Sequence, residues 1–127
     1  MALTVGIDVV DVERIRKATD SGVSLTDLFT SSEIRECMSL AGAHARLAAC
    51  FAIKEAFLKA SGLGLNSGLL FKDIEVVNQG RGVTELRLSQ RVRELTGVAD
   101  PTTCLVSSAF TDTLACAAVA LQNRGIE

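Results

Sequence analysis

The chain has 127 residues, of which 48% are hydrophobic and 22% are charged, and its formal net charge is −2. This length predicts a single domain over residues 1–127, because globular domains typically contain about 100–150 residues. The slight negative charge and the absence of Trp and Tyr exclude a general nucleic-acid-binding surface, which needs basic and aromatic side chains. The mean hydropathy of +0.33 is high for a small monomer and indicates apolar surface buried between subunits.

The four cysteines have no spacing typical of a zinc site or a redox motif, and the single His44 does not complete one. We interpret them as small buried thiols in a reducing compartment. The first residues lead directly into a predicted strand, so no signal peptide is expected. No apolar run approaches the roughly 18–20 residues that cross a bilayer. These observations predict a cytoplasmic protein.

The first predicted element is a strand over residues 2–9. Successive side chains of a strand point to opposite faces, so its large aliphatic residues share one face and Asp8 lies on the other with Gly6. Asp8 is either a solvated side chain on the open face of a sheet or a metal ligand. Gly6 leaves room for another group to approach the backbone. The apolar face consists of Leu3, Val5, Ile7 and Val9.

A short helix is predicted over residues 11–17, with Arg14 and Lys17 on its outer side. An apolar turn or short helix follows at 25–29. The hydroxyls of residues 30–32 can then cap a helix that continues to residue 40.

A long helix is predicted over residues 43–60, because this segment is rich in helix-forming residues and ends at a glycine suited to the C-terminal cap. Glu55 falls on an apolar stripe of this helix, where a carboxylate is costly unless it is paired or bound to a cation. Lys59 lies one turn further on. An ordinary ion pair between the two, worth about 0.2–0.5 kcal/mol, is the alternative interpretation.

The rest of the chain predicts a hairpin, a short helix and two more strands. A glycine-containing loop over 62–68 lacks the Lys-Ser/Thr end of a phosphate-binding P-loop. Together the elements predict an α+β domain with an antiparallel sheet packed on a long central helix. The almost continuously apolar last strand is expected to be buried on both faces or at a subunit interface. As a neighbour of the first strand, it would bring Asp8 near Glu55. The predicted spans are a hairpin of 71–78 with 84–88, a helix over 89–96, and strands over 104–110 and 114–121.

Two stretches resemble a known family. The segment Val5-Gly6-Ile7-Asp8-Val9-Val10-Asp11 resembles the opening strand of bacterial holo-acyl-carrier-protein synthases, which are small 4′-phosphopantetheinyl transferases. The segment Lys54-Glu55-Ala56-Phe57-Leu58-Lys59-Ala60 resembles the Lys-Glu-Ala-x-x-Lys-Ala signature of the same family. Both occur in the expected order in a chain of the right length, which makes the match fairly specific.

The resemblance implies transfer of 4′-phosphopantetheine from coenzyme A to a serine of an acyl carrier protein, by a homotrimer with active sites between protomers. Asp8 and Glu55 would bind Mg²⁺, a hard cation that prefers oxygen ligands. Glu55 or a metal-bound water would take the serine proton. Lys59 would stabilise phosphate charge, with Lys54 beside it as a second cation. Arg14 and Lys17 would meet the acidic carrier protein, unless they are simply a solvated helix face.

Three departures from the family pattern affect the part that holds coenzyme A. Cys50 stands where the family usually has Arg, and Ala109 and Phe110 stand where it usually has Ser and His. The Gly-Lys-Pro segment of the family is also absent. Two interpretations follow. The first is a transferase that binds coenzyme A through Arg46, Arg81 or Ser107 instead. The second is a repurposed family member that binds a carrier protein, or acts on its acyl chain in an apolar pocket of Cys50, Ala109 and Phe110. Simple core packing is a third interpretation for Phe110.

Overall fold

The computed structural model describes residues 2–22, 25–63, 71–79, 82–98 and 104–123. In chain order its elements are β1 (Ala2–Asp11), α1 (Val12–Asp20), the 3-10 helix η1 (Leu25–Asp27), α2 (Ser31–Met38), α3 (Ala43–Ser61), the 3-10 helix η3 (Phe71–Asp73), β2 (Ile74–Val77), β3 (Glu85–Leu88), α4 (Gln90–Thr96), β4 (Cys104–Phe110) and β5 (Leu114–Asn123). These spans agree closely with the predicted elements. None of the helices within the described ranges is long and apolar enough to cross a membrane.

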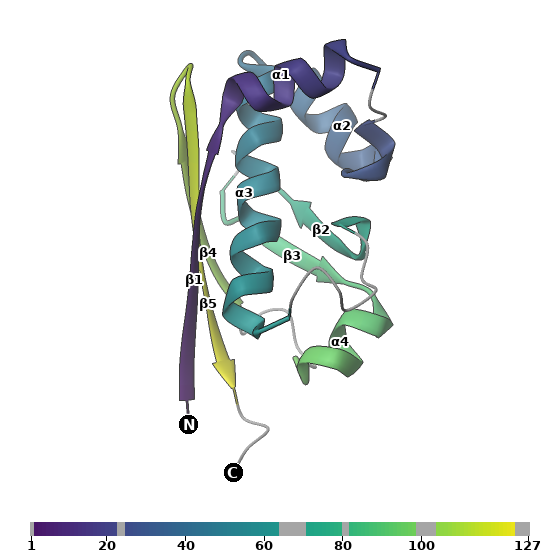
Figure 1. Cartoon of the computed structure of the whole chain (residues 1–127). Helices are drawn as coiled ribbons and strands as arrows, with labels where there is room; N and C mark the ends of the chain where they lie inside the picture. Colours follow the sequence, from purple (N-terminus) through teal and green to yellow (C-terminus); the bar gives the residue numbers. More distant parts are fainter. Residues whose placement is uncertain (1, 23–24, 64–70, 80–81, 99–103, 124–127) are drawn as a thin grey trace.

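The strands form two antiparallel sheets. β1, β5 and β4 lie side by side in that order, and β2 pairs with β3 in a separate hairpin. The predicted pairing of the first and last strands is confirmed, with Asp8 opposite Ala117. The α+β class is therefore confirmed, with the strands divided between two sheets on either side of α3 (Figure 1).

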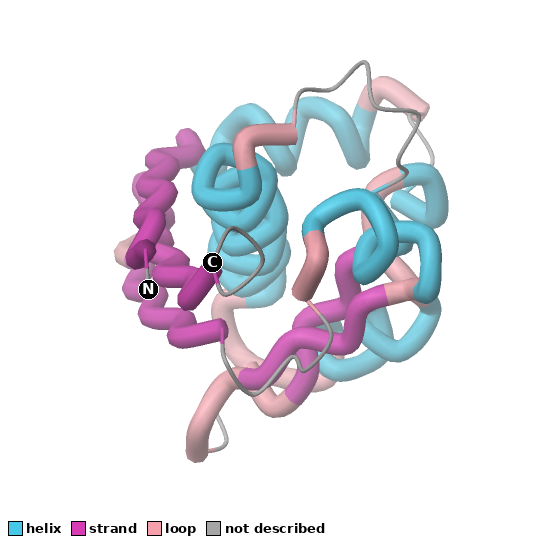
Figure 2. The backbone as a smooth tube through the Cα atoms, turned by 90° about the horizontal axis from the view of Figure 1, so that it is seen from below, coloured by secondary structure: helices cyan, strands magenta, loops and turns pink. Residues whose placement is uncertain are grey.

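Helix α3 is the centre of the molecule. It packs against β1 and β5 on one side and against α2 and β2 on the other, and Figure 2 shows it end-on between the two sets of strands. Thirteen of its 19 residues are buried. The helix is therefore apolar almost all round rather than along one stripe, as is typical of a helix enclosed in a core. Gly62, with φ of +75°, ends it as predicted.

The helix approaches β1 very closely at Gly6. A Cβ atom on Gly6 would overlap the carbonyl oxygen of Ala56 and lie 2.7 Å from the backbone nitrogen of Ala60. The group for which Gly6 makes room is therefore helix α3. This close contact places the Asp8 face of β1 against the face of α3 that carries Glu55 and Lys59.

The opposite, outer face of the sheet is apolar and uncovered in one copy of the chain. The four large aliphatic residues of β1 that alternate with Asp8 are between 56% and 64% exposed. The last strand β5 is covered on one face only, by α3. The interpretation that it is buried on both faces within the chain is therefore wrong.

The cysteines differ in exposure. Cys37 and Cys50 are buried, Cys104 is half-buried and Cys116 is exposed on the outer face of the sheet. The prediction of four buried thiols is wrong for the last two. Cys116 is exposed because it alternates with the inward residues of β5, Ala115 and Ala117.

Candidate active site

The structure brings Asp8 to Lys59 at the contact between β1 and α3. Lys59 Nζ donates hydrogen bonds to Asp8 Oδ1 and to the backbone oxygen of Ile7, each at 3.0 Å. The Asp8 side chain is only 16% exposed. The alternative of a solvated Asp8 on an open face is therefore wrong, because that face is covered by α3.

Glu55 lies one helical turn before Lys59, within electrostatic reach of Asp8. Partial burial raises the pKa of the Glu55 carboxyl, and the nearby Asp8 charge raises it further, while Lys59 and Arg14 oppose the shift. Two carboxylates that disfavour each other's charge are stabilised by a shared cation. The pattern is more than an ordinary Glu55–Lys59 ion pair, because Lys59 bonds Asp8 instead.

The donor set at this point suits a hard divalent cation. Asp8 and Glu55 contribute only oxygen atoms, and Mg²⁺ is typically held by one or two carboxylates together with waters and substrate phosphates. Within the described ranges, no group of three or more His, Cys, Asp or Glu side chains forms a complete protein cage for a metal. The two carboxylates therefore fit an ion that shares its coordination with a substrate.

Arg14 and Lys17 both lie on the exposed surface of α1, and the charge of Arg14 acts on Glu55 of the carboxylate site. The Arg14 guanidinium lies 5.8 Å from the centre of the Phe51 ring. Lys17 lies in the last turn of α1 and is exposed. Arg14 therefore places a positive charge near Glu55, whereas Lys17 lies at the far end of α1.

Lys54 does not have the predicted ligand-binding position. Its side chain is fully buried, and Nζ donates to Glu33 Oε1 at 2.7 Å and to the backbone oxygens of Leu28 and Phe71 at 3.0 Å. All three ammonium hydrogens are therefore used within the fold, so no donor remains for coenzyme A. The prediction fails because the Lys54 ammonium is held by α2 and by η3, whereas Lys59 of the same helix bonds β1.

Glu33, the partner of Lys54, was missed as a site residue in the sequence. In the structure it is the third residue of a capping box with Thr30 at the start of α2. Its ion pair spans 21 residues and follows no local spacing, so the sequence carries no signal for it.

A cavity of 590 Å³ lies between the β2–β3 hairpin connection and β4. Arg46 and Ser107, two of the residues predicted to bind coenzyme A, both line it. Arg81, the third, lies outside the described residues, although Gly82 lines the cavity. Gln79, which the sequence did not single out, also lines it and donates to the backbone oxygen of Arg46 at 3.1 Å.

The three residues that replace the family's Arg, Ser and His do not meet in one pocket. Ala109 and Phe110 line the 590 Å³ cavity, and the Arg46 guanidinium lies 5.2 Å from the centre of the Phe110 ring. Cys50 is buried in the core, where its thiol donates to Glu33 Oε2 at 3.2 Å and burial raises its pKa well above the ordinary value. The pocket predicted to include Cys50 is therefore wrong, and so is simple core packing for Phe110, which is 38% exposed.

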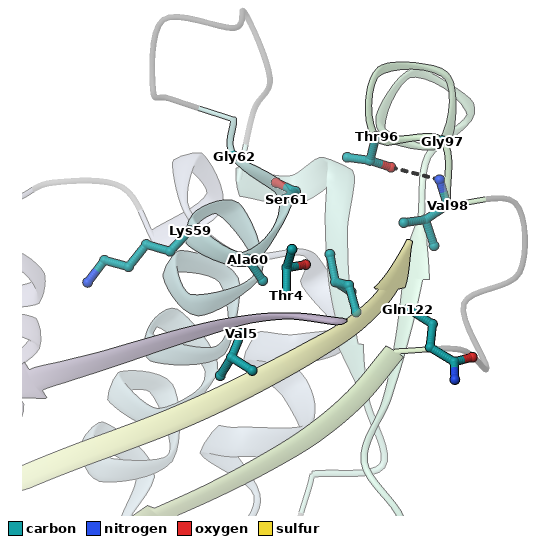
Figure 3. A pocket seen from close by; sticks show the side chains of 11 residues that line it. Thr4, Val5, Lys59, Ala60, Ser61, Gly62, Thr96, Gly97, Val98 and Gln122 are labelled. Carbon is teal, nitrogen blue, oxygen red and sulfur yellow. Dashed lines mark hydrogen bonds between the residues drawn. The ribbon is translucent and has the colours of Figure 1, made fainter. Parts of the chain in front are cut away.

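A second cavity, of 410 Å³, lies at the C-terminal end of α3 (Figure 3). Ser61, Thr96 and Gln122 contribute polar groups to its lining, and neither Asp8 nor Glu55 takes part. Lys59 belongs to the lining, but its side chain extends away from Ser61 and Thr96 in Figure 3, and its amine bonds Asp8. This cavity is therefore adjacent to the carboxylates and distinct from them.

The sequence and the fold both match one family. The model of the 4′-phosphopantetheinyl transferase superfamily matches residues 4–118. A holo-acyl-carrier-protein synthase of Geobacter sp. strain M21 is 40% identical over 119 residues, which cover 92% of this chain and 95% of the relative.

Two solved structures share the fold. The holo-acyl-carrier-protein synthase of Helicobacter pylori in complex with coenzyme A aligns with a TM-score of 0.77 and 26% identity, over 91% of this chain and 96% of that one. The Chronobacterium ammoniagenes complex of the same enzyme with coenzyme A aligns with a TM-score of 0.82 and 23% identity, over 98% and 99%. The chain therefore belongs to the 4′-phosphopantetheinyl transferase superfamily.

Proposed function

We propose that this protein transfers 4′-phosphopantetheine from coenzyme A to a serine of an acyl carrier protein, with Mg²⁺ as its metal. The observation that carries the proposal is the placement of Asp8, Glu55 and Lys59 together at the β1–α3 contact. The names of the relatives support the reaction, and two of the similar structures hold coenzyme A.

The residues of the site suit each part of the reaction. The serine oxygen attacks the phosphorus that bears the pantetheine arm, the bond to the bridging oxygen breaks, and adenosine 3′,5′-bisphosphate leaves. Asp8 and Glu55 would hold the magnesium, which neutralises pyrophosphate charge. Lys59 places a positive charge beside the same phosphates. Glu55 would accept the serine proton.

The 590 Å³ cavity is the second part of the proposal. Arg46 and Ser107 offer a cation and a hydroxyl for the nucleotide end of coenzyme A, and charge-assisted hydrogen bonds to phosphate are among the stronger polar contacts. An acyl-chain pocket would be mainly apolar, whereas this lining also includes Gln79 and Thr84. The cavity thus favours a transferase over a repurposed acyl-binding protein.

Assembly and location complete the proposal. The uncovered apolar face of the β1–β5–β4 sheet supports a homotrimer with active sites between protomers. Arg14 and Lys17 on α1 offer positive charge to an acidic carrier protein. The four free thiols support a reducing compartment such as the cytoplasm.

Mass spectrometry tests the proposal. An apo carrier protein encoded near this gene is incubated with the enzyme, coenzyme A and Mg²⁺, and the mass is expected to increase by one phosphopantetheine group. The increase should disappear when EDTA removes the divalent ions. A panel of cognate carriers with no mass increase would refute the transferase assignment.

A further inference from the structure

We propose that Glu33 and Lys54 are positioning residues, which together hold helix α3 in the rotation that presents Glu55 to Asp8. The catalytic role of Glu55 in this inference rests on the proposed function. The placement of α3 by the Glu33–Lys54 pair does not depend on that function.

The Glu33–Lys54 pair is enclosed and fully bonded. The Lys54 and Glu33 side chains are 0% and 1% exposed, and their charged atoms lie 2.7 Å apart. Lys54 also bonds the backbone oxygens of Leu28 and Phe71, which lie before and after α3 in the chain. A buried ion pair is weak evidence for stability, but its directional bonds fix how the helix that carries it is turned.

Glu33 connects three elements through one carboxylate. Oε1 accepts from the backbone nitrogen of Thr30 at the start of α2 and from Lys54 of α3. Oε2 accepts from the backbone nitrogen of Val76 in β2 at 2.7 Å and from the Cys50 thiol. Since burial raises the Cys50 pKa well above its ordinary value, Cys50 stays neutral. The Glu33 carboxylate and the Lys54 ammonium therefore neutralise each other.

The contact of α3 with β1 gives the helix little directional hold, because Gly6 lies directly against the backbone of Ala56 and Ala60. The large buried side chains of α3, such as Leu47, Ile53 and Phe57, contribute packing, but packing lacks the fixed direction of a hydrogen bond. Glu55 directly follows Lys54 and precedes Lys59, which bonds β1. The two lysines therefore tie α3 to opposite sides of the molecule, with Glu55 between them.

The decisive variant is Glu33→Gln/Lys54→Met, which removes both charges and leaves neither one buried alone. We expect it to fold, to show a Glu55 pKa that returns toward the ordinary carboxyl value, and to bind Mg²⁺ about tenfold more weakly or worse, as is typical when support of a metal ligand is lost. The Glu55 pKa is measured by carbon-detected NMR titration of the metal-free protein, and Mg²⁺ affinity by calorimetry. Should the double variant not fold, Glu33→Asp, which keeps the charge but withdraws it by one methylene, is measured for the same two effects.

Val92→Ala is the matched control. Val92 is fully buried in α4, which packs on β3, so the variant loses stability while Glu55 keeps its pKa. A folded double variant with wild-type Glu55 pKa and Mg²⁺ affinity would overturn the inference. Failure of the wild type to modify any carrier would refute the proposed function alone, because the NMR titration would still decide whether the pair positions Glu55.

Discussion

At the scale of single residues, the fold makes the negative charge of Glu55 unfavourable. Burial and the nearby Asp8 raise its pKa, so the folded protein holds this proton more tightly than the unfolded chain does. The stability of the metal-free protein therefore falls as pH rises from the ordinary carboxyl pKa of about 4.3 to the raised value. Above that interval, the charged Glu55 costs stability until a cation binds.

We therefore predict opposite effects of Glu55→Gln on stability and activity. In EDTA at pH 7 the variant should melt at a higher temperature than the wild type, and the difference should vanish below about pH 4, where Glu55 is protonated. Mg²⁺ should raise the melting temperature of the wild type only. Transfer should fall by roughly 10²–10⁴-fold, because a proton acceptor and a metal ligand are lost. Differential scanning calorimetry measures the melting temperatures, and the mass assay on the carrier protein measures transfer. Glu94→Gln, at an exposed position of α4, is the control. A variant that melts below the wild type in EDTA would contradict the assigned electrostatics.

How much the sequence could predict at this scale depended on the range of the interaction. Strand alternation and helix spacing, which are local, single out Asp8, Glu55 and Lys59 as candidate residues, although they do not show that the three meet. The roles of Lys54 and Cys50 do not, because both depend on Glu33, which is 21 residues away from Lys54 and 17 from Cys50. A lysine next to a signature glutamate resembles a ligand-binding residue until its buried partner is visible.

At the scale of elements, the spans of helices and strands were predictable because caps and periodicity are local, as the Thr30 capping box and the Gly62 cap show. Which face of β1 meets the core was not predictable. Alternation placed the large aliphatic residues together, but it could not show that the smaller face, with Gly6 and Asp8, packs on α3. The face that packs on α3 is decided by how closely the helix approaches the strand. That approach is so close that the backbone of α3 touches Gly6.

The predicted consequence is that Gly6→Ala separates β1 from α3. A methyl group here meets backbone atoms of Ala56 and Ala60, which cannot rotate away as a side chain would. We expect a loss of about 3 kcal/mol or more in the free energy of unfolding, at the upper end of overpacking effects, together with weaker Mg²⁺ binding as Asp8 moves away from Glu55. Urea unfolding monitored by circular dichroism measures the first effect.

The double variant Gly6→Ala/Ala56→Gly separates the two possible origins of this loss. Because the obstructing atoms belong to the backbone, removing the Ala56 side chain should restore no stability. Recovery in the double variant would show that side-chain crowding, rather than backbone approach, governs this contact.

At the scale of the whole molecule, the outer face of the β1–β5–β4 sheet is apolar and exposed in the single chain. The outer side chains of β1 are joined by Leu105 of β4, which is 68% exposed. Between Val5 and Leu105, the small residues Ala118 and Ala120 of β5 form the floor of a 190 Å³ hollow. An apolar face with large residues at its edges and a hollow between them suits an interface between copies of the chain. This face also explains the high mean hydropathy.

We therefore predict that Leu105→Asp dissociates the oligomer. A carboxylate buried against an apolar partner has no counter-charge there and disfavours association strongly, whereas in the separated chain the same position faces water. Size-exclusion chromatography with light scattering should show a trimer for the wild type and a monomer for the variant, and transfer should be lost with assembly if the sites lie between protomers. Leu95→Asp, at a 48% exposed position on α4 outside this face, should change neither. A monomeric wild type with full activity would contradict the trimer, and a trimeric Leu105→Asp variant would place the interface on another surface.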